Sequence, residues 1–317
     1  MKPDLPASFV VSQEIARALE LKQPVVALES TVITHGLPYP ENLTLAQDIE
    51  NAVRQFGATP ATIGVLEGKI HVGLQPAHIQ ELASGGSALW KISPRDFAPV
   101  VAKRASGGTT VAGTLYVAHQ VGIRVFATGG IGGVHYELSK RPHGAADISA
   151  DLPALAHTPM VVVCAGAKAI LDLQATLEYL ETWGVPVVGY QTDQFPAFYA
   201  ANSGFKTSAR ADSPEEVALL AHTHWSLGMS SAVLVAVPPP ADVAMDTEAV
   251  KRAVLEALRQ AQRDKVRGKE VTPYLLNKML ELTGGESLRA NLGLLLNNAA
   301  VASQIAQVIM QEPPSGN

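Results

Sequence analysis

Short, nearly continuous apolar runs recur along this chain, and longer stretches with helical periodicity separate them. The runs are rich in valine and do not alternate apolar with polar residues, so each is expected to be a strand buried on both faces. Strands that alternate with helices predict a largely parallel sheet with helices on both sides. The runs are Pro24–Leu28, Ile123–Ala127, Met160–Cys164, Val185–Gly189 and Ala232–Ala236.

One hairpin makes the predicted sheet mixed. Thr62–Val65 and Ile70–Leu74 are apolar segments joined through Gly68, a spacing that predicts two antiparallel strands. Residues 41–56 carry apolar side chains at steps of three and four, which is typical of an amphipathic helix. The fold class predicted from these patterns is α/β, with a central mixed, mostly parallel sheet between helical layers.

The C-terminal third is predicted to be helical. Asp246 is a candidate N-cap for a helix over Thr247–Arg263. Thr272-Pro273 has the composition of a helix start, and Ser287 precedes a long apolar helix that ends near Met310. No linker rich in serine, glycine and proline divides the chain, so we expect a single domain.

Composition narrows the classes of function. The 317 residues are 47% hydrophobic and 17% charged, which is enough apolar material for a sizeable core; we expect one domain over residues 1–317 with a core of about 12–309. The formal net charge of −5 gives no basic surface for a nucleic acid backbone, so no nucleic acid partner is expected.

The single cysteine and the hydropathy of the chain bear on its location. Cys164 cannot form an internal disulfide, and there is no cysteine cluster to hold zinc. No stretch reaches the roughly 18 consecutive apolar residues of a membrane span, and the N-terminus lacks a secretory pattern. We therefore expect a cytoplasmic protein without a membrane partner.

Chemically distinctive residues follow several of the predicted strands. Ligands in parallel α/β sheets bind beyond the carboxyl ends of the strands. Glu29 follows the first apolar run, Lys91 follows residues 88–90, the glycine-rich segment 128–135 follows the next run, and Lys168 follows Cys164. These positions are the candidates for a shared site.

Lys168 lies among small apolar residues at the end of a predicted buried strand. An ammonium there is costly to desolvate, and desolvation favours the neutral amine. A neutral amine in an apolar pocket is a nucleophile toward a carbonyl or masked aldehyde, which Schiff-base catalysis requires. The residues equally allow Lys168 to reach solvent at a helix start or to pair with a carboxylate.

Two glycine-containing segments could bring backbone N–H groups to an anion. Thr128–Gly133 has four glycines after a strand, a pattern that suits phosphate but also suits a plain tight turn. It matches neither the Walker motif nor GxGxxG. Ser106–Thr110 leads into a helical run, where Thr109 or Thr110 could act as a cap alone.

Asp147 and Asp151 are candidate ligands for a divalent cation. Carboxylates with water completing the shell suit Mg²⁺ or Mn²⁺, although Asp151 is equally placed to be the N-cap of a helix through Leu155. His222 and His224 lie two apart in a helical stretch and face different directions, so we interpret both as structural.

Ala27–Thr31 with His35–Pro40 closely resembles the opening signature of the pseudouridine-5′-phosphate glycosidases, the family that includes indigoidine synthase A-like proteins. Further segments resemble the family in family order, from about Ser12 to Ile309. They are Pro60–Ile63, Thr109–Ala112, Thr128–His135, Asp147–Asp151, Cys164–Lys168, Gly189–Asp193, Phe195–Tyr199, Gly268–Pro273 and Leu296–Ala299. Residues 136–144 depart from the family pattern, being more charged.

The resemblance implies reversible cleavage of the C–C glycosidic bond of pseudouridine 5′-phosphate to uracil and ribose 5-phosphate, with Mn²⁺ as the usual metal. It also implies an α/β/α fold with a mixed sheet and a homotrimer. By the same resemblance Lys168 is the covalent lysine and Glu29 the proton donor. The other implied roles are substrate contact for Lys91, Val111, Ser149, Ala150 and Asp151, and metal ligation for Asp147.

Further substrate contacts are expected from Thr128, Gly130 and His135, and from Asn291. The amides of Asn291, Asn297 and Asn298 could read the uracil edge, although helix packing suits at least two of them. A Schiff-base aldolase or another sugar-phosphate lyase would use the same lysine, carboxylate and phosphate site. A non-catalytic nucleotide-binding module would use the glycine segments without Lys168.

Overall fold

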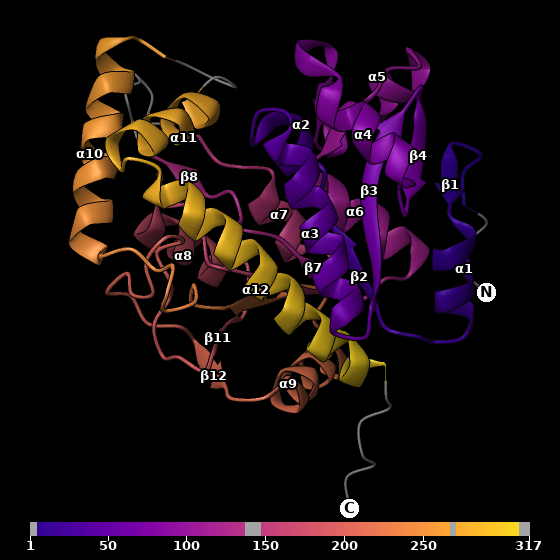
Figure 1. The fold of residues 1–317 in the computed structure, drawn as a ribbon. Helices are drawn as coiled ribbons and strands as arrows, with labels where there is room; N and C mark the ends of the chain where they lie inside the picture. Colours follow the sequence, from indigo (N-terminus) through magenta and orange to yellow (C-terminus); the bar gives the residue numbers. More distant parts are fainter. Residues whose placement is uncertain (1–4, 137–146, 267–270, 311–317) are drawn as a thin grey trace, which may run out of the picture.

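The computed structural model describes residues 5–136, 147–266 and 271–310, and its centre is an 11-stranded mixed sheet (Figure 1). The main path of the sheet runs in the order β1-β4-β3-β2-β7-β9-β13-β11-β12, and β6, with β5 beside it, branches from β3. The strands are β1 (Phe9–Val11), β2 (Val25–Leu28), β3 (Thr59–Leu66), β4 (Lys69–Val72), β5 (Trp90–Ile92), β6 (Gly107–Thr109), β7 (Val125–Ala127), β9 (Val161–Cys164), β11 (Val187–Tyr190), β12 (Ala209–Ala211) and β13 (Val233–Ala236).

The predicted apolar runs form β2, β7, β9, β11 and β13, which are adjacent and parallel in the sheet. Every residue of β2, β9, β11 and β13 is buried, which explains why these strands show no alternation. The predicted hairpin is β3–β4, antiparallel, with Glu67 and Gly68 at its turn. Both turn residues have positive φ, 47° and 75°, as a tight hairpin turn with right-handed twist requires.

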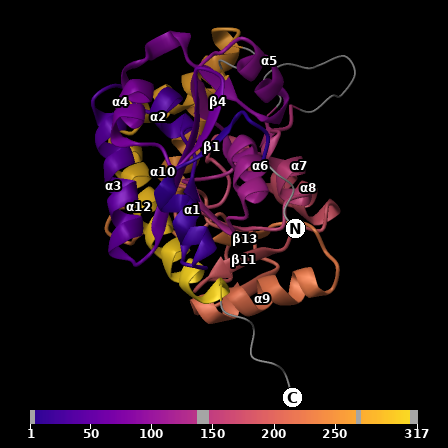
Figure 2. The ribbon, with the colours of Figure 1, turned by 90° about the vertical axis from the view of Figure 1, so that its right-hand side faces the viewer.

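Helices cover both faces of the sheet (Figure 2). Figure 2 shows α3 and α12 on one side and α6, α7 and α8 on the other. The helices are α1 (Gln13–Glu20), α2 (Thr31–His35), α3 (Glu41–Gln55), α4 (Pro76–Ser84), α5 (Phe97–Ala102), α6 (Val111–Val121), α7 (Asp151–Ala156), α8 (Leu173–Thr182), α9 (Pro214–Ser226), α10 (Thr247–Arg263), α11 (Val271–Leu282) and α12 (Glu286–Ile309). A small second sheet pairs β8 (Val134–His135) with β10 (Leu171–Asp172). The α/β/α prediction is confirmed.

The C-terminal helices agree with the prediction except at the start of α12. Asp246 caps α10, since its Oδ1 accepts the Ala249 N–H at 2.8 Å. Ser287, predicted to precede the last helix, lies inside it: α12 begins at Glu286 after Gly285, whose φ is 91°. The left-handed Gly285 makes the turn from α11, so no serine cap is needed.

Helix α12 alone in the described chain has the length and apolar composition of a membrane-spanning helix. In the structure it crosses the sheet and packs on α3, α9, β2, β7 and β9 (Figure 1). Its fully buried side chains include Ala290, Leu294 and Ala302. The apolar composition of α12 is therefore that of a core helix.

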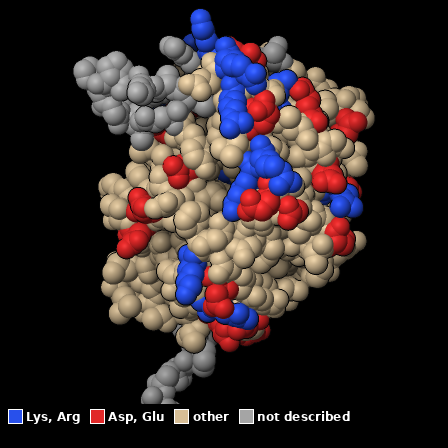
Figure 3. All heavy atoms as spheres, turned by 90° about the vertical axis from the view of Figure 1, so that its left-hand side faces the viewer, with Lys and Arg blue, Asp and Glu red and all other residues tan. Residues whose placement is uncertain are grey.

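The outer face of the molecule that carries α10 mixes both signs of charge (Figure 3). Glu248 pairs with Lys251 at 2.9 Å, and Glu256 with Arg263 at 2.8 Å. Exposed pairs of this kind each contribute at most about 1 kcal/mol to stability. They keep the helix surface solvated and leave its other side to pack on α11.

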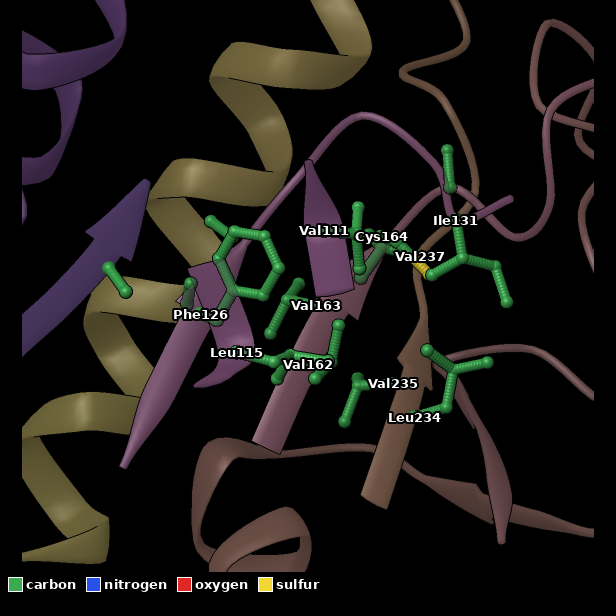
Figure 4. Close-up of a cluster of buried hydrophobic side chains, with 14 of the residues drawn as sticks. Val111, Leu115, Phe126, Ile131, Val162, Val163, Cys164, Leu234, Val235 and Val237 are labelled. Atoms are coloured by element: carbon green, nitrogen blue, oxygen red, sulfur yellow. The ribbon is translucent and has the colours of Figure 1, made fainter. Parts of the chain in front are cut away.

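The core lies on both faces of the central strands, with α6 on one side and α12 on the other (Figure 4). Figure 4 shows Phe126 of β7, Val162 and Val163 of β9, and Leu115 of α6 in one cluster. All four side chains are fully buried. This packing fixes the strands whose carboxyl ends carry the candidate site.

Replacing Phe126 should destabilise the fold strongly. Phe126→Ala removes a side chain that is 0% exposed and leaves a cavity, so the free energy of unfolding should fall by about 3–5 kcal/mol. Phe56→Ala is the control, because Phe56 is 41% exposed and should cost far less. Urea denaturation measures both, and equal losses would contradict this description of the core.

Candidate active site

Three neighbouring strands, β2, β7 and β9, end at one edge of the sheet and bring together residues distant in sequence. Leu28 is in register with Ala127, and Ala127 with Val163, so the residues after these strands lie side by side. The edge opens into a cleft of about 980 Å³, part of it open to solvent. Its lining includes Glu29, Thr31, Val32, His35, Lys91, Gly129, Gly130, Lys168, Phe198, Tyr199, Pro273, Leu276, Asn277, Leu280, Leu288, Asn291 and Leu295.

Glu29 sits at the inner end of the cleft, beside Thr128. The Thr128 hydroxyl donates to Glu29 Oε1 at 2.5 Å. Burial raises the pKa of Glu29; the charge of Lys168, the Thr128 hydrogen bond and the charge of Lys91 oppose the rise, and the nearby Asp151 adds to it. Glu29 therefore keeps its proton to higher pH than an ordinary glutamate, as a proton donor needs.

Lys168 is half-buried and held by its backbone on a loop after β9. Its N–H donates to the Ile131 carbonyl at 3.1 Å, and the loop is tied again where Ala165 N–H donates to Gly129 at 2.9 Å. No helix begins at Lys168, so the alternative of a helix-start lysine is wrong, and no ion pair joins Lys168 to a described carboxylate. Lys168 faces the cleft and is close enough to Glu29 to act on its charge.

Glycine is required at position 166 for this loop. Gly166 has φ of 85°, in the left-handed region, and a Cβ there would lie 2.5 Å from the Pro196 carbonyl oxygen. The close approach brings the segment Phe195–Tyr199 against the Lys168 loop. Phe198 and Tyr199 thereby reach the cleft.

Lys91 reaches the same cleft from another part of the sheet. It lies within β5 rather than after a strand, which corrects the sequence prediction. Burial lowers the pKa of Lys91, and the charge of Lys168 lowers it further, against the attraction of Asp151 and Glu29. Two mutually repelling lysines in one cleft favour an anionic ligand.

The glycine segment Thr128–Gly133 serves packing and internal hydrogen bonds. None of its glycines has a positive φ, and three of the N–H groups in the segment donate within the protein, so those three are not free to hold a phosphate. The three bonds are Thr128 N to Val163 O at 3.0 Å, Ile131 N to Gly166 O at 3.1 Å and Gly132 N to Asp151 Oδ2 at 2.8 Å. Its glycines allow close contact: a Cβ on Gly130 would lie 2.6 Å from the Phe198 ring.

Asp151 links the glycine segment to the start of α6. Its Oδ2 accepts the Gly132 N–H, and its Oδ1 accepts the Ala112 N–H at 2.9 Å. It is the first residue of α7, with Ala150 at the N-cap position, so the N-cap alternative is wrong. Ser149 Oγ in turn accepts the Asp151 N–H at 3.2 Å. The predicted segment Ser149–Asp151 thus packs beside the site and supports it.

Val111 is the first residue of α6, and Thr110 caps the helix by accepting the Gly113 N–H at 3.2 Å. The capping interpretation of Thr110 is confirmed. A first-turn N–H has no partner within its own helix, so the Val111 backbone N–H points out of the helix start.

Asp147 and His135 lie next to each other at the edge of the site. The Asp147 carbonyl accepts the His135 N–H at 2.9 Å. Burial lowers the pKa of His135, Asp147 acts to raise it, and Lys168 and Lys91 lower it. Among residues 5–136, 147–266 and 271–310 no group of three His, Cys, Asp or Glu residues could hold a metal. The charged segment 136–144 lies outside the described residues beyond Tyr136.

Of the three candidate asparagines on α12, one faces the cleft and two form hydrogen bonds to the backbone. Asn291 lines the cleft. Asn297 Nδ2 donates to the Pro238 carbonyl at 3.5 Å, and Asn298 Nδ2 donates to the Thr128 carbonyl at 2.8 Å. The prediction that at least two of these asparagines serve helix packing is confirmed for Asn297 and Asn298. His222 and His224 are structural as predicted, bonded to the Ile309 carbonyl and the Ser231 hydroxyl.

Sequence reasoning did not predict the aromatic and amide side chains that line one part of the cleft. Phe198 has φ of 62°, a strained conformation for a bulky residue of the kind that gathers at functional sites. Tyr199, Asn277 and Leu276 were missed too. The only signal for them was the aromatic segment Phe195–Tyr199, since α11 carries its cleft residues in an ordinary helical pattern.

Comparisons with known proteins find a matching family model and similar relatives. The family model for indigoidine synthase A-like proteins matches residues 14–308. A relative named pseudouridine-5′-phosphate glycosidase from Geobacillus kaustophilus is 49% identical, covering 94% of this chain and 98% of the relative. One of the same name from Saccharopolyspora erythraea is 50% identical, covering 95% and 97%.

Two solved structures share the fold. The prealnumycin C-glycosynthase AlnA, in complex with ribulose 5-phosphate, superimposes with a TM-score of 0.88 at 40% identity, covering 96% of this chain and 98% of AlnA. An indigoidine synthase A-like protein from Thermotoga maritima gives a TM-score of 0.86 at 33% identity, covering 97% and 99%.

The contact between Gly130 and Phe198 can be tested by adding one methyl group. Gly130→Ala should lower the free energy of unfolding by about 1–3 kcal/mol, because the new Cβ overlaps the Phe198 ring. Phe198→Leu in the same chain should recover part of that loss by making room. A Gly130→Ala protein as stable as the wild type in urea would show that the two loops do not pack this closely.

Proposed function

The chain belongs to the family of indigoidine synthase A-like proteins, and we propose that it cleaves the C–C glycosidic bond of pseudouridine 5′-phosphate reversibly to uracil and ribose 5-phosphate. The observation that carries the proposal is the meeting of Lys168 and Glu29 in one cleft. The names of the relatives and the sugar phosphate bound by AlnA support the substrate class.

A carbon leaving group explains why an amine is needed. Ordinary glycosidases use two carboxylates and protonate the oxygen that leaves. The uracil carbon of a C-glycoside has no lone pair to protonate. A covalent bond from lysine to the sugar opens the ring first and divides one high barrier into two lower ones.

The steps then follow from the two side chains. The Lys168 amine attacks C1′ and forms a C–N bond while the C1′–O4′ bond breaks, and Glu29 gives its proton to O4′. The nitrogen lone pair next expels uracil, whose C5 takes a proton as the C1′–C5 bond breaks, leaving a lysine–sugar imine. Water hydrolyses the imine, which releases ribose 5-phosphate and the free amine.

The 5′-phosphate is proposed to bind at Lys91 and at the start of α6. Lys91 forms no ion pair with the described carboxylates, so a phosphate would give its ammonium group a counter-charge. The Val111 N–H at the N-terminus of α6 is a second donor for an anion. This binding energy would position C1′ at Lys168, so nucleosides without the phosphate should react poorly.

The apolar side chains of the cleft lining are proposed to hold the base. Leu276, Leu280, Leu288 and Leu295 line the cleft, with Asn291 offering an amide donor and acceptor. A flat base between apolar walls with one amide is a common arrangement for recognising a heterocycle.

A Mn²⁺ ion is proposed at Asp147. Hard divalent cations keep several waters and need only one or two protein carboxylates beside a phosphate, which fits a site with Asp147 as the ligand and His135 beside it. When bound, the ion would neutralise charge on the substrate phosphate. A homotrimer is proposed from the family resemblance. A cytoplasmic location is proposed from the sequence, and the buried free thiol of Cys164 is compatible with a reducing compartment.

Removing the nucleophile tests the reaction. Lys168→Ala should abolish release of uracil from pseudouridine 5′-phosphate, measured chromatographically in the presence of Mn²⁺. Lys168→Arg is the control that keeps a positive charge but has no amine nucleophile at neutral pH, and it should also be inactive. An active Lys168→Ala enzyme would remove lysine from the mechanism. A wild-type enzyme that cleaves sugar phosphates without releasing uracil would favour the Schiff-base aldolase instead.

Removing the proposed ligand tests the metal. Asp147→Ala should weaken the activation of the enzyme by Mn²⁺, because the only proposed protein carboxylate is lost. Asp242→Ala, at an exposed aspartate away from the cleft, should leave the Mn²⁺ dependence unchanged. The measurement is uracil release against Mn²⁺ concentration, and the same curve for Asp147→Ala and wild type would contradict the assignment.

A further inference from the structure

Asn298 is a fully buried amide on the helix that crosses the sheet behind the cleft. It is 0% exposed, and its Nδ2 donates to the Thr128 carbonyl at 2.8 Å and to the Gly129 carbonyl at 3.4 Å. Its Oδ1 has no hydrogen-bond partner among the described residues. Burying an unpaired amide oxygen costs free energy. The hydrogen bonds of the Asn298 side chain are therefore those that its NH₂ group donates.

The carbonyls of Thr128 and Gly129, which Asn298 binds, lie between the residue that contacts Glu29 and the loop that carries Lys168. Thr128 is fixed from its other side as well, since its N–H donates to the Val163 carbonyl at 3.0 Å. The Gly129 carbonyl also accepts the Ala165 N–H, in the loop that leads to Lys168. A Cβ on Gly129 would lie 3.1 Å from Leu295, so α12 lies tightly against this turn.

The backbone of Thr128 is held on both sides, and its side-chain hydroxyl makes one hydrogen bond within the described part of the chain. Its hydroxyl is 2.5 Å from Glu29 Oε1 and donates to it. Thr128 is 2% exposed, so water does not readily replace that hydroxyl. The position of the Thr128 backbone therefore helps to set where its hydroxyl meets the Glu29 carboxyl group.

We propose that Asn298 is a positioning residue for the proton donor: through the Thr128 carbonyl it holds the Thr128 hydroxyl on Glu29. The inference rests on the proposed function, in which Glu29 gives a proton to the sugar ring oxygen. Asn298 is not among the residues that line the cleft. It acts on the reaction only through Thr128.

The proposal predicts how Glu29 titrates. The groups that act on Glu29 are Lys168, Lys91 and Asp151 with the Thr128 hydroxyl, and of these the hydroxyl belongs to the residue whose carbonyl Asn298 binds at 2.8 Å. Because the hydrogen bond from the Thr128 hydroxyl stabilises the carboxylate, losing it raises the pKa of Glu29 further. In a variant the loss of activity at high pH should therefore occur at higher pH than in the wild type.

The test compares two neighbouring amides. Asn298→Leu keeps a similar shape but removes the donor, and it should lower kcat by about tenfold, part of the roughly hundredfold or more that a positioned general acid contributes. It should also shift the basic limb of the pH–activity profile to higher pH. Asn297→Leu removes an amide that bonds to Pro238 instead, and it should leave the limb in place. Asn298→Ala is the second variant if the leucine prevents folding.

A double-mutant cycle shows whether Asn298 acts through Thr128. Thr128→Val should shift the limb in the same direction, and Asn298→Leu added to it should have little further effect. Additive losses, or a limb that does not move in Asn298→Leu, would overturn the proposal and leave Asn298 as packing alone.

A readout without substrate separates this inference from the proposed function. Titration of ¹³C-labelled glutamate carboxyls by NMR, with the Glu29 signal assigned by its loss in Glu29→Gln, gives the pKa of Glu29 in the free protein. An upward shift in Asn298→Leu and none in Asn297→Leu supports the positioning role even if wild type releases no uracil. Absence of a shift in Asn298→Leu would contradict it even if the proposed reaction proceeds.

Discussion

The register of β2, β7 and β9 is the constraint on which the site depends. These strands are buried and parallel, so their carboxyl ends stop at one level and place Glu29, Thr128 and the Lys168 loop in one group. A slip of register by one residue would move every side chain to the opposite face of the sheet, against a different helical layer, which close packing on both faces opposes. The alignment thus follows from the same valine-rich runs that make the strands.

The charged groups of the cleft suit an anionic ligand. Burial raises the pKa of Glu29, and burial together with the charge of Lys168 lowers the pKa of Lys91. A phosphorylated ligand would give the lysines a counter-charge. The carboxylate of Asp151 is near but is occupied by two backbone N–H groups, and it therefore serves as a brace between loops.

Most of the fold and the central pair of the site could be predicted from sequence. The apolar runs gave the buried strands because burial on both faces removes alternation, and the strand ends then indicated Glu29 and Lys168. Lys91 was placed correctly in the cleft but wrongly after a strand. The roles of Asp151 and the glycine segment could not be predicted, because a carboxylate or an N–H shows its partner only once distant loops meet. Phe198 was missed as a functional residue for the same reason, and Asn298 was named only as a candidate for the uracil edge or for helix packing.

The central claim is that the Lys168 amine forms a bond with the sugar. Borohydride reduction of the protein with ribose 5-phosphate, followed by peptide mass spectrometry, locates that bond directly. We predict a reduced pentose phosphate adduct on the peptide that contains Lys168 and on no other lysine. Uracil release from pseudouridine 5′-phosphate by an enzyme that forms no adduct, or forms it at another lysine such as Lys91, would contradict the account.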